Sequence, residues 1–198
     1  MDISLAALEG LFPTTPPHDD SSLQALAVRA RADASAFALL YDHFFARVYN
    51  YTRYHVHDAQ TADDLTAQIF ERVLRYLASY KPEQGAFDAW LFAIARSVVS
   101  NYHRSNNRWR WLSWDHLREQ PSDAAHPETA LEQHHQHARL LQAVATLDQR
   151  EQDVIALRFG SGLTNRQIAT LTGLSDSNVG VILHRALRKL RQKLDGQE

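Results

Sequence analysis

Apolar residues that recur at steps of three and four constrain the fold of this chain more than any other feature of its sequence. The first run predicts a helix from residue 34, with one apolar face: Phe37, Leu40, Tyr41, Phe44, Val48 and Tyr51. A second run predicts a helix over residues 61–80, with these positions inward: Leu65, Ile69, Phe70, Val73, Leu74 and Leu77. A third helix begins near Phe87 and continues into residues 101–111, with these positions inward: Trp90, Leu91, Ile94, Ala95 and Val98. Glycine and proline are scarce, at 7 and 6, so we expect an all-α protein.

Two breaks in this periodicity predict two small helical domains, over residues 35–111 and 138–194. Residues 1–34 contain three prolines in their first half, and we expect a partly disordered N-terminal extension there. Asp20 and Ser22 can cap a helix that follows the prolines. Residues 112–137 lose the helical spacing and gain prolines and scattered acids, which is typical of a flexible linker.

Several classes of protein are excluded or disfavoured. The chain has no cysteine, so disulfides and thiolate metal sites are excluded. No secretory signal or apolar run of about 18–20 residues is visible, so we expect a cytoplasmic protein without membrane insertion. No glycine-rich phosphate loop, serine elbow or carboxylate pair suggests an enzyme, a catalytic residue or a cofactor.

Eleven histidines raise the question of a metal site. They gather in two groups, one with His55 and His57 and the other with His134, His135 and His137. Neither group has the helical His pair with a carboxylate base that marks a zinc protease. We therefore expect exposed linker histidines and no metal.

The distribution of charge along the chain is more informative about its binding surfaces than the net charge of −2. Residues 96–111 hold four arginines and no acid, and residues 182–194 hold five Lys or Arg and no acid. One such run alone would suit a solvated helix face. Two of them in a nearly neutral chain predict two surfaces that face phosphates.

Residues 164–190 carry the most specific spacing. Thr164 precedes a short predicted helix, and Gly173 follows it, where glycine turns most easily through a left-handed backbone. Small Ala169 lets two helices approach, and Val179 packs the second helix on the first. This spacing predicts a helix-turn-helix, although an ordinary helical hairpin shares it. The outer face of the second helix favours DNA binding because it is polar and mostly basic: Asn178, His184, Arg185, Arg188, Lys189 and Arg191.

In a helix-turn-helix, the second helix enters the major groove with its N-terminal side chains at base edges. We expect base reading by residues near its start: Ser175, Ser177, Asn178 and Val181. Asparagine can bond adenine in two places, and a valine methyl can touch a thymine methyl. Arg185 and Arg188, with His184 beside them, follow later in the helix and are expected at phosphates.

Three segments, in order, carry a resemblance to a known family. Residues 146–159 (TLDQREQDVIALRF), with the helix-turn-helix and HRAL at 184–187, resemble the fourth domain of sigma factors. Residues 62–73 (ADDLTAQIFERV) resemble the helix by which sigma factors grip the polymerase clamp. Residues 87–96, with WLFAIAR at 90–96, resemble their helix for melting and reading the −10 element. The whole is similar to the extracytoplasmic-function (ECF) class, which keeps only the second and fourth sigma domains.

The resemblance implies a sigma factor that binds core RNA polymerase through its clamp and flap, promoter DNA, and an anti-sigma factor. It implies a polymerase-binding face on the second helix: Asp63, Asp64, Gln68 and Glu71. It also implies a −10 surface of cations, which hold phosphates, and flat side chains, which receive unstacked bases: Arg96, Asn101, Tyr102, Arg104, Arg108, Trp109 and Arg110.

Two other classes stay open. One is a sigma-like adaptor that sequesters an anti-sigma factor without touching DNA, and the other is a plain helix-turn-helix regulator. The sequence also departs from the family. Gly180 and Ile182 stand where basic residues are frequent, and Ser97 and Asn101 replace a frequent asparagine and aspartate. The −35 contacts are therefore expected to rest on Asn178, Arg185 and Arg188, or to be weak.

Overall fold

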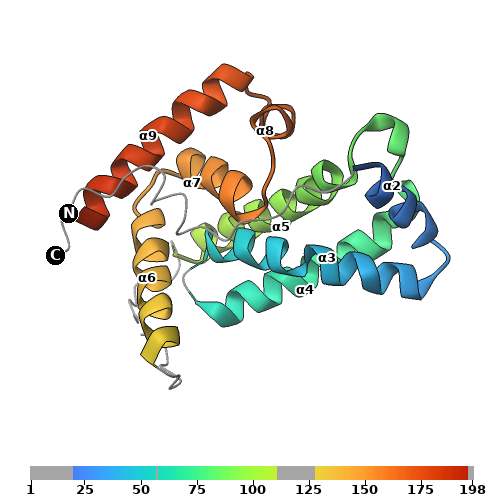
Figure 1. The fold of residues 1–198 in the computed structure, drawn as a ribbon, viewed down its shortest axis with the longest axis horizontal. Coiled ribbons are helices and arrows are strands. Elements are labelled where there is room, and N and C mark those ends of the chain that lie inside the picture. The colour runs from blue at the N-terminus through green and yellow to red at the C-terminus, as the bar shows by residue number, and fades with distance from the viewer. Residues whose placement is uncertain (1–19, 57, 111–127, 196–198) are drawn as a thin grey trace.

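The computed structural model describes residues 20–56, 58–110 and 128–195, which form helices and no strand (Figure 1). Residues 20–110, here the N-terminal bundle, contain α2 (Asp20–Arg29), α3 (Ala34–Arg53), α4 (Ala59–Tyr76), η1 (Leu77–Ser79), η2 (Pro82–Gln84) and α5 (Phe87–Arg110). Residues 128–195, here the C-terminal bundle, contain α6 (Glu128–Val144), α7 (Gln149–Ile155), η3 (Ala156–Gly160), α8 (Asn165–Thr172) and α9 (Asp176–Asp195). The expectation of an all-α protein is confirmed.

Helices α3 and α4 form an antiparallel hairpin, and each begins at an aspartate cap. The Asp33 side chain accepts from the backbone N–H groups of Ser35 and Ala36, and Asp58 accepts from that of Thr61 at 2.6 Å. The predicted stripes are buried at most positions: Leu40, Phe44, Val48, Tyr51, Leu65, Ile69, Phe70, Val73 and Leu77. The inward placement of Tyr41 and Leu74 is wrong, because 38% and 55% of their surfaces are exposed. Helix α4 also ends at Tyr76, before the predicted residue 80.

Helix α2 belongs to the N-terminal bundle, although residues 20–34 were expected in a separate extension. It packs against α3 and α5, and its Leu23 and Ala27 are buried. Just after it, Ala30 is buried and the Arg31 guanidinium donates to the backbone oxygen of Tyr80. These contacts make α2 part of the N-terminal bundle. Residues 1–19 lie outside the described residues.

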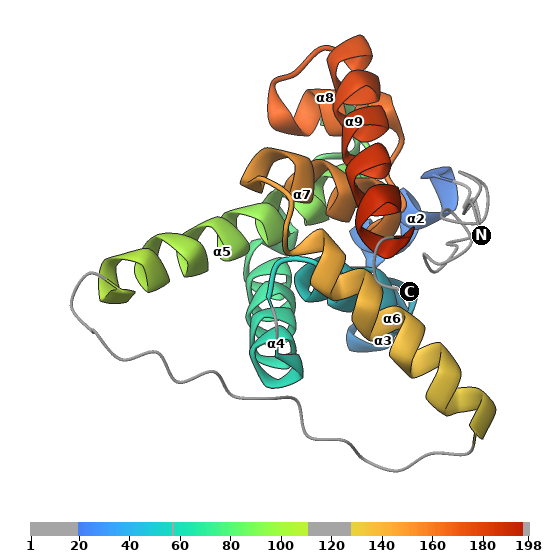
Figure 2. The ribbon, with the colours of Figure 1, turned by 90° about the vertical axis from the view of Figure 1, so that its left-hand side faces the viewer.

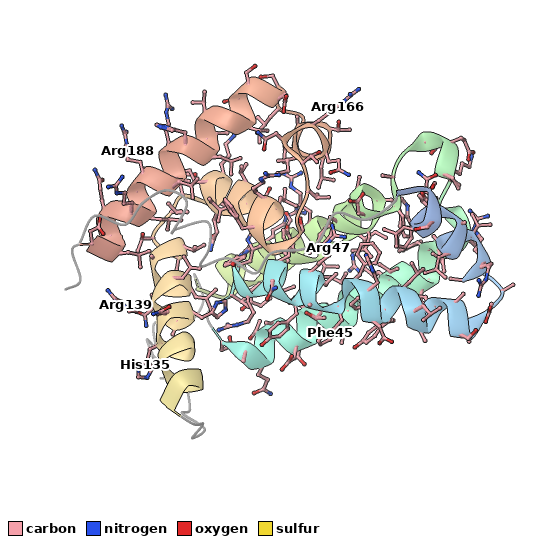
Figure 3. All side chains as sticks on the ribbon, viewed as in Figure 1. Phe45, Arg47, His135, Arg139, Arg166 and Arg188 are labelled. Carbon is pink, nitrogen blue, oxygen red and sulfur yellow. The ribbon has the colours of Figure 1, made fainter. Side chains whose placement is uncertain are left out.

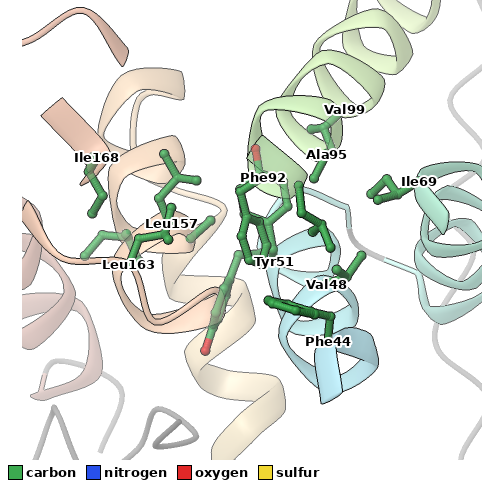
Figure 4. Packing of buried hydrophobic residues seen from close by; sticks show 14 of the residues in the cluster. Phe44, Val48, Tyr51, Ile69, Phe92, Ala95, Val99, Leu157, Leu163 and Ile168 are labelled. Atoms are coloured by element: carbon green, nitrogen blue, oxygen red, sulfur yellow. The ribbon is translucent and has the colours of Figure 1, made fainter. Parts of the chain in front are cut away.

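Helix α5 crosses the hairpin and completes the first core. Its Leu91, Phe92, Ala95, Val98 and Val99 are buried, while Trp90 and Ile94 are partly buried against the same core. Figure 4 shows Phe92 facing Tyr51 of α3. The helix continues to Arg110, so the predicted extension into the basic segment is confirmed in its backbone. Its far end, with the basic segment, extends well beyond the hairpin (Figure 2).

The C-terminal bundle begins earlier than its spacing suggested. Helix α6 starts at Glu128, so the expected linker over 112–137 is wrong in its second half, while 111–127 lie outside the described residues. Capping boxes begin α7 at Asp148 and α8 at Thr164. Between them, η3 is a wide π-helical turn. Gly173 has φ of 74° and ends α8, as the helix-turn-helix spacing predicted.

The two bundles pack directly against each other. The turn η3 lies on α3, and α8 contacts α5. Tyr51 stands at this junction, with Val48 and Phe92 on one side and Leu157 on the other (Figure 4). One hydrophobic cluster therefore runs through both bundles.

Candidate nucleic-acid interface

The N-terminal half of α9 presents the predicted base-reading side chains to solvent. Ser175, Ser177, Asn178 and Val181 are exposed, and Ser175 Oγ accepts from the backbone N–H of Asn178 at 3.2 Å, which caps the helix. Val179 and Ile182 turn the opposite way and are buried. Ile182 is therefore a core residue, and its apolar side chain is not part of the reading face.

Some cations in the later half of α9 form ion pairs within the C-terminal bundle, and others are exposed to solvent. Lys189 Nζ donates to both carboxylate oxygens of Glu151, at 2.6 and 2.8 Å, and Arg191 lies 3.7 Å from Asp195. His184, Arg185 and Arg188 are exposed, and Arg188 points away from the bundle in Figure 3. Within the described residues, neither Arg185 nor Arg188 has an ion pair or a hydrogen bond. These two arginines are thus available for phosphates.

The predicted −10 surface is only partly open. Asn101 and Arg104 are exposed on α5, and Tyr102 is half-buried against the core. Arg96 is engaged by the other bundle: its Nε donates to Asp153 Oδ2 at 2.7 Å, and Nη1 donates to the Leu171 backbone oxygen at 3.2 Å. The side chains of Arg108, Trp109 and Arg110 lie outside the described residues.

The polymerase-binding face predicted on α4 is exposed along its length, at Asp63, Asp64, Gln68 and Glu71. Glu71 pairs with Arg75 at 2.6 Å on the same helix. Sequence reasoning missed the aromatic surface beside this face. Tyr41 and Phe45 are each 38% exposed, and the Tyr41 ring lies 4.5 Å from that of Phe70. The sequence analysis placed Tyr41 in the buried stripe and did not assign Phe45, so it did not predict this exposed aromatic surface.

A cleft of about 680 Å³ lies where the bundles meet. Its lining includes Tyr51, His55, Arg96, His103 and Asp153. Burial, with the charge of Asp153, raises the pKa of Tyr51 well above its usual value, so the phenol stays protonated and donates to Asp153 Oδ1 at 3.2 Å. Burial lowers the pKa of His55 to about 4, although Asp153 opposes the change.

The histidines form no metal site that the structure describes. Across residues 20–56, 58–110 and 128–195, no group of three His, Asp or Glu could hold an ion. His135 is exposed and His137 half-buried on α6, while His57 and the His134 side chain lie outside the described residues. In the same ranges, no helix has the length and apolar character needed to cross a membrane.

Exposed polar and basic residues on a helix-turn-helix, with a second basic helix in the other bundle, define a two-domain helical protein that binds DNA. Comparison with known proteins narrows this class. Residues 40–109 match the family model of sigma-70 region 2, and residues 143–192 match that of sigma-70 region 4. The ECF RNA polymerase sigma factor BldN of Streptomyces coelicolor is 31% identical over 177 residues, which are 89% of this chain and 67% of BldN.

A second relative is similar to the chain at nearly the same identity. The ECF RNA polymerase sigma factor SigX of Bacillus subtilis is 30% identical over 169 residues, which are 80% of this chain and 84% of SigX. The chain therefore belongs to the ECF RNA polymerase sigma factors, which function in transcription initiation.

Two solved structures share the fold. CnrH, in complex with the cytosolic domain of CnrY, aligns with a TM-score of 0.67 over 91% of this chain and 100% of its own, at 23% identity. The sigma factor RpoE of Bartonella quintana, in complex with the anti-sigma factor NepR, aligns with a TM-score of 0.63 over 82% of this chain and 98% of its own, at 16% identity.

Proposed function

We propose that this protein is an alternative sigma factor that binds core RNA polymerase in the cytoplasm and directs it to a set of promoters. The observation that carries the proposal is the order of two matched regions, region 2 at 40–109 and region 4 at 143–192, each on its own helical bundle. The role is binding and duplex opening rather than catalysis.

In this proposal, α9 binds the −35 element. Its supports are the exposed side chains at the helix start, Ser175, Ser177, Asn178 and Val181, and the exposed cations later in the helix, Arg185 and Arg188. His184 lies between the two groups. Phosphate contacts fix register, and the residues at the helix start read bases.

Arg185→Ala or Arg188→Ala tests the −35 surface. Each change should weaken binding to −35 DNA and reduce the salt slope of log affinity by about one unit, because one phosphate contact releases about one counterion. Arg75→Ala is a matched control, since Arg75 is an exposed arginine of α4 that pairs with Glu71. An unchanged salt slope in both α9 variants would remove them from the phosphate surface.

In the same proposal, α5 binds the −10 element. Arg96, Asn101, Tyr102 and Arg104 offer cations, an amide and an aromatic plane along one helix, and Arg108, Trp109 and Arg110 extend the same segment. Single-strand binding combines a cationic groove with stacking planes. A base extruded from the duplex costs a few kcal/mol, which contacts in the melted segment must offset.

Two protein partners follow from the family. Core polymerase would dock on the α4 face that carries Asp63, Asp64, Gln68 and Glu71. An anti-sigma factor is proposed as the second partner because the sigma factor RpoE of Bartonella quintana forms a complex with the anti-sigma factor NepR, and CnrH forms one with the cytosolic domain of CnrY.

Reconstitution with core polymerase tests the proposal as a whole. The holoenzyme should initiate transcription on the protein's own genome, and sequencing of the transcripts should reveal a shared promoter. No initiation at any promoter, with tight binding to an anti-sigma factor, would indicate a sigma-like adaptor instead. DNA binding without binding to core polymerase would indicate a plain helix-turn-helix regulator.

A further inference from the structure

Lys189 lies in the basic run of α9, yet it is bonded to another helix of the C-terminal bundle. Its Nζ donates to both carboxylate oxygens of Glu151 on α7, at 2.6 and 2.8 Å. The Glu151 side chain is 9% exposed, so the cation of Lys189 is a partner that this buried carboxylate needs. A lysine has three N–H donors, and two of them are used in this pair.

Glu151 is itself fixed at the start of α7. Its Oε2 accepts from the backbone N–H of Asp148 at 3.3 Å, and Asp148 Oδ1 accepts from the backbone N–H of Glu151 at 2.9 Å. This capping box holds the carboxylate in one orientation. Lys189 is therefore bonded to a rigid point of α7, and this bond joins α9 to the helix beside it.

Helical spacing places Lys189 on the same stripe of α9 as a base-reading residue. Lys189 follows Asn178 by about three full turns, at 3.6 residues per turn. The two side chains therefore share one rotation of α9 about its axis. A bond that fixes this rotation at Lys189 also fixes the direction in which Asn178 points.

The inward face of α9 is largely apolar, with Val179, Leu183, Leu187 and Leu190 buried. Apolar burial holds the helix on its bundle but is non-directional. Hydrogen bonds to a fixed carboxylate have a preferred geometry, so the pair of Lys189 and Glu151 also resists rotation of the helix.

A small rotation of α9 is enough to disturb base reading. Side-chain tips lie about 5–6 Å from a helix axis, so a rotation of about 20° moves them by about 2 Å. The groups of a binding site must stay within about 0.5 Å of their productive positions. Loss of the bond at Lys189 would therefore misplace Asn178 even though the two residues do not touch.

We propose that Lys189 is a positioning residue for reading of the −35 element: with Glu151 it sets the rotation of α9, and it contacts no DNA phosphate. The proposal rests on the sigma-factor function proposed above. It divides the basic run of α9 by role, because Arg185 and Arg188 hold phosphates while Lys189 holds the helix.

Lys189→Met, which keeps the aliphatic stem and removes the charge, provides the first test. The full chain is assembled with core polymerase on the promoter that transcript sequencing identifies, and on the same promoter with one −35 base pair changed. Lys189→Met should weaken binding to the intact promoter about fivefold, the lower end of what one bidentate base contact contributes. The ratio of the two affinities, here the −35 discrimination, should fall toward one.

The salt dependence of binding separates positioning from a phosphate contact. Lys189→Met should keep the wild-type salt slope, whereas Arg188→Ala should lower it by about one unit and keep the −35 discrimination. A slope lowered by about one unit in Lys189→Met would overturn the proposal. Wild-type discrimination in Lys189→Met would also overturn it, including when the variant unfolds at a lower temperature, since the pair would then be merely structural.

Glu151→Gln tests the partner on α7. Glutamine keeps the size of the side chain and also suits this capping-box position, so the change mainly removes the charge that holds Lys189. Glu151→Gln should lower the −35 discrimination as Lys189→Met does, and the double variant should be no worse than either single one. Additive losses, or wild-type discrimination in Glu151→Gln, would refute the pairing.

Two controls complete the experiment. Arg29→Met removes an exposed ion pair of α2, with Asp33 at 3.4 Å, and should leave affinity, salt slope and discrimination unchanged. On a promoter with a scrambled −35 element, Lys189→Met and wild type should bind equally, because α9 then reads no cognate bases; a loss there would overturn the proposal. A wild-type holoenzyme without −35 discrimination would instead refute the −35 function of α9 itself.

Discussion

Acidification should destabilise this protein through one buried imidazole. His55 follows α3, its side chain is 3% exposed, and its Nε2 lies 3.7 Å from Asp153 Oδ1. Neither ring nitrogen has a hydrogen-bond partner within the described residues. Burial lowers the pKa of His55 from 6.5 to about 4; the Asp153 charge opposes this effect, while His103 and Arg96 add to it.

The sign and size of the effect follow from proton linkage. A state that exposes the ring to water, by unfolding or by separation of the bundles, takes up a proton near pH 6.5, whereas the closed fold takes it up near pH 4. Stability is therefore full above pH 6.5 and falls as the pH drops toward 4. At about 1.4 kcal/mol per pKa unit, the total loss is on the order of 3 kcal/mol.

Urea unfolding, followed by circular dichroism at several pH values between 4.5 and 7.5, measures this loss. The carboxylates with lowered pKa values, Asp33, Asp58 and Asp148, titrate below this window and contribute little to it. His55→Phe keeps a ring against Tyr51 and should flatten the pH dependence. His135→Phe, at an exposed histidine of α6, should leave it as in wild type. A His55→Phe profile as steep as that of wild type would refute the reasoning.

Three further changes should alter stability in urea titrations at pH 7.5. Thr164→Ala removes the hydroxyl that accepts from the Gln167 backbone N–H and should cost about 1 kcal/mol; an unchanged midpoint would mean that the cap contributes nothing. Phe92→Ala empties a fully buried ring site and should cost about 3–5 kcal/mol, and a loss under 1 kcal/mol would contradict the packing in Figure 4. Gly180→Ala should stabilise α9 by about 0.5–1 kcal/mol, since open space surrounds its Cβ, and a loss would show an unforeseen contact.

Much of the fold was predictable because helical periodicity reports which side of each helix is buried. The stripe through Leu40, Phe44 and Val48 and the turn at Gly173 are local patterns, and both are confirmed. The exposure of Asn178 and Val181 on α9 followed from the same rule, since Val179 and Leu183 face inward on the opposite side, whereas the burial of Ile182 was not predicted.

The errors occurred where periodicity and linker composition were weak guides. Tyr41 lies at a core-compatible step of α3, yet within the described residues it stays 38% exposed, with its ring beside that of Phe70 at the edge of an aromatic surface. Helix α6 begins at Glu128, although its first turns lack the apolar spacing that marks a buried helix. The burial of α2 depends on α3 and α5, which its own short sequence does not specify.

The sequence by itself determined the all-α fold, the helix-turn-helix and the family, because these depend on spacing within segments of a few tens of residues. Only the tertiary structure decided what Arg96 binds. The sequence marks Arg96 as a cation of a DNA surface, while its partner Asp153 lies 57 residues away. The same holds for Arg47 and Ser161, which are 114 residues apart. Such pairs form when packed bundles bring distant segments together, and no local pattern encodes which surfaces will meet.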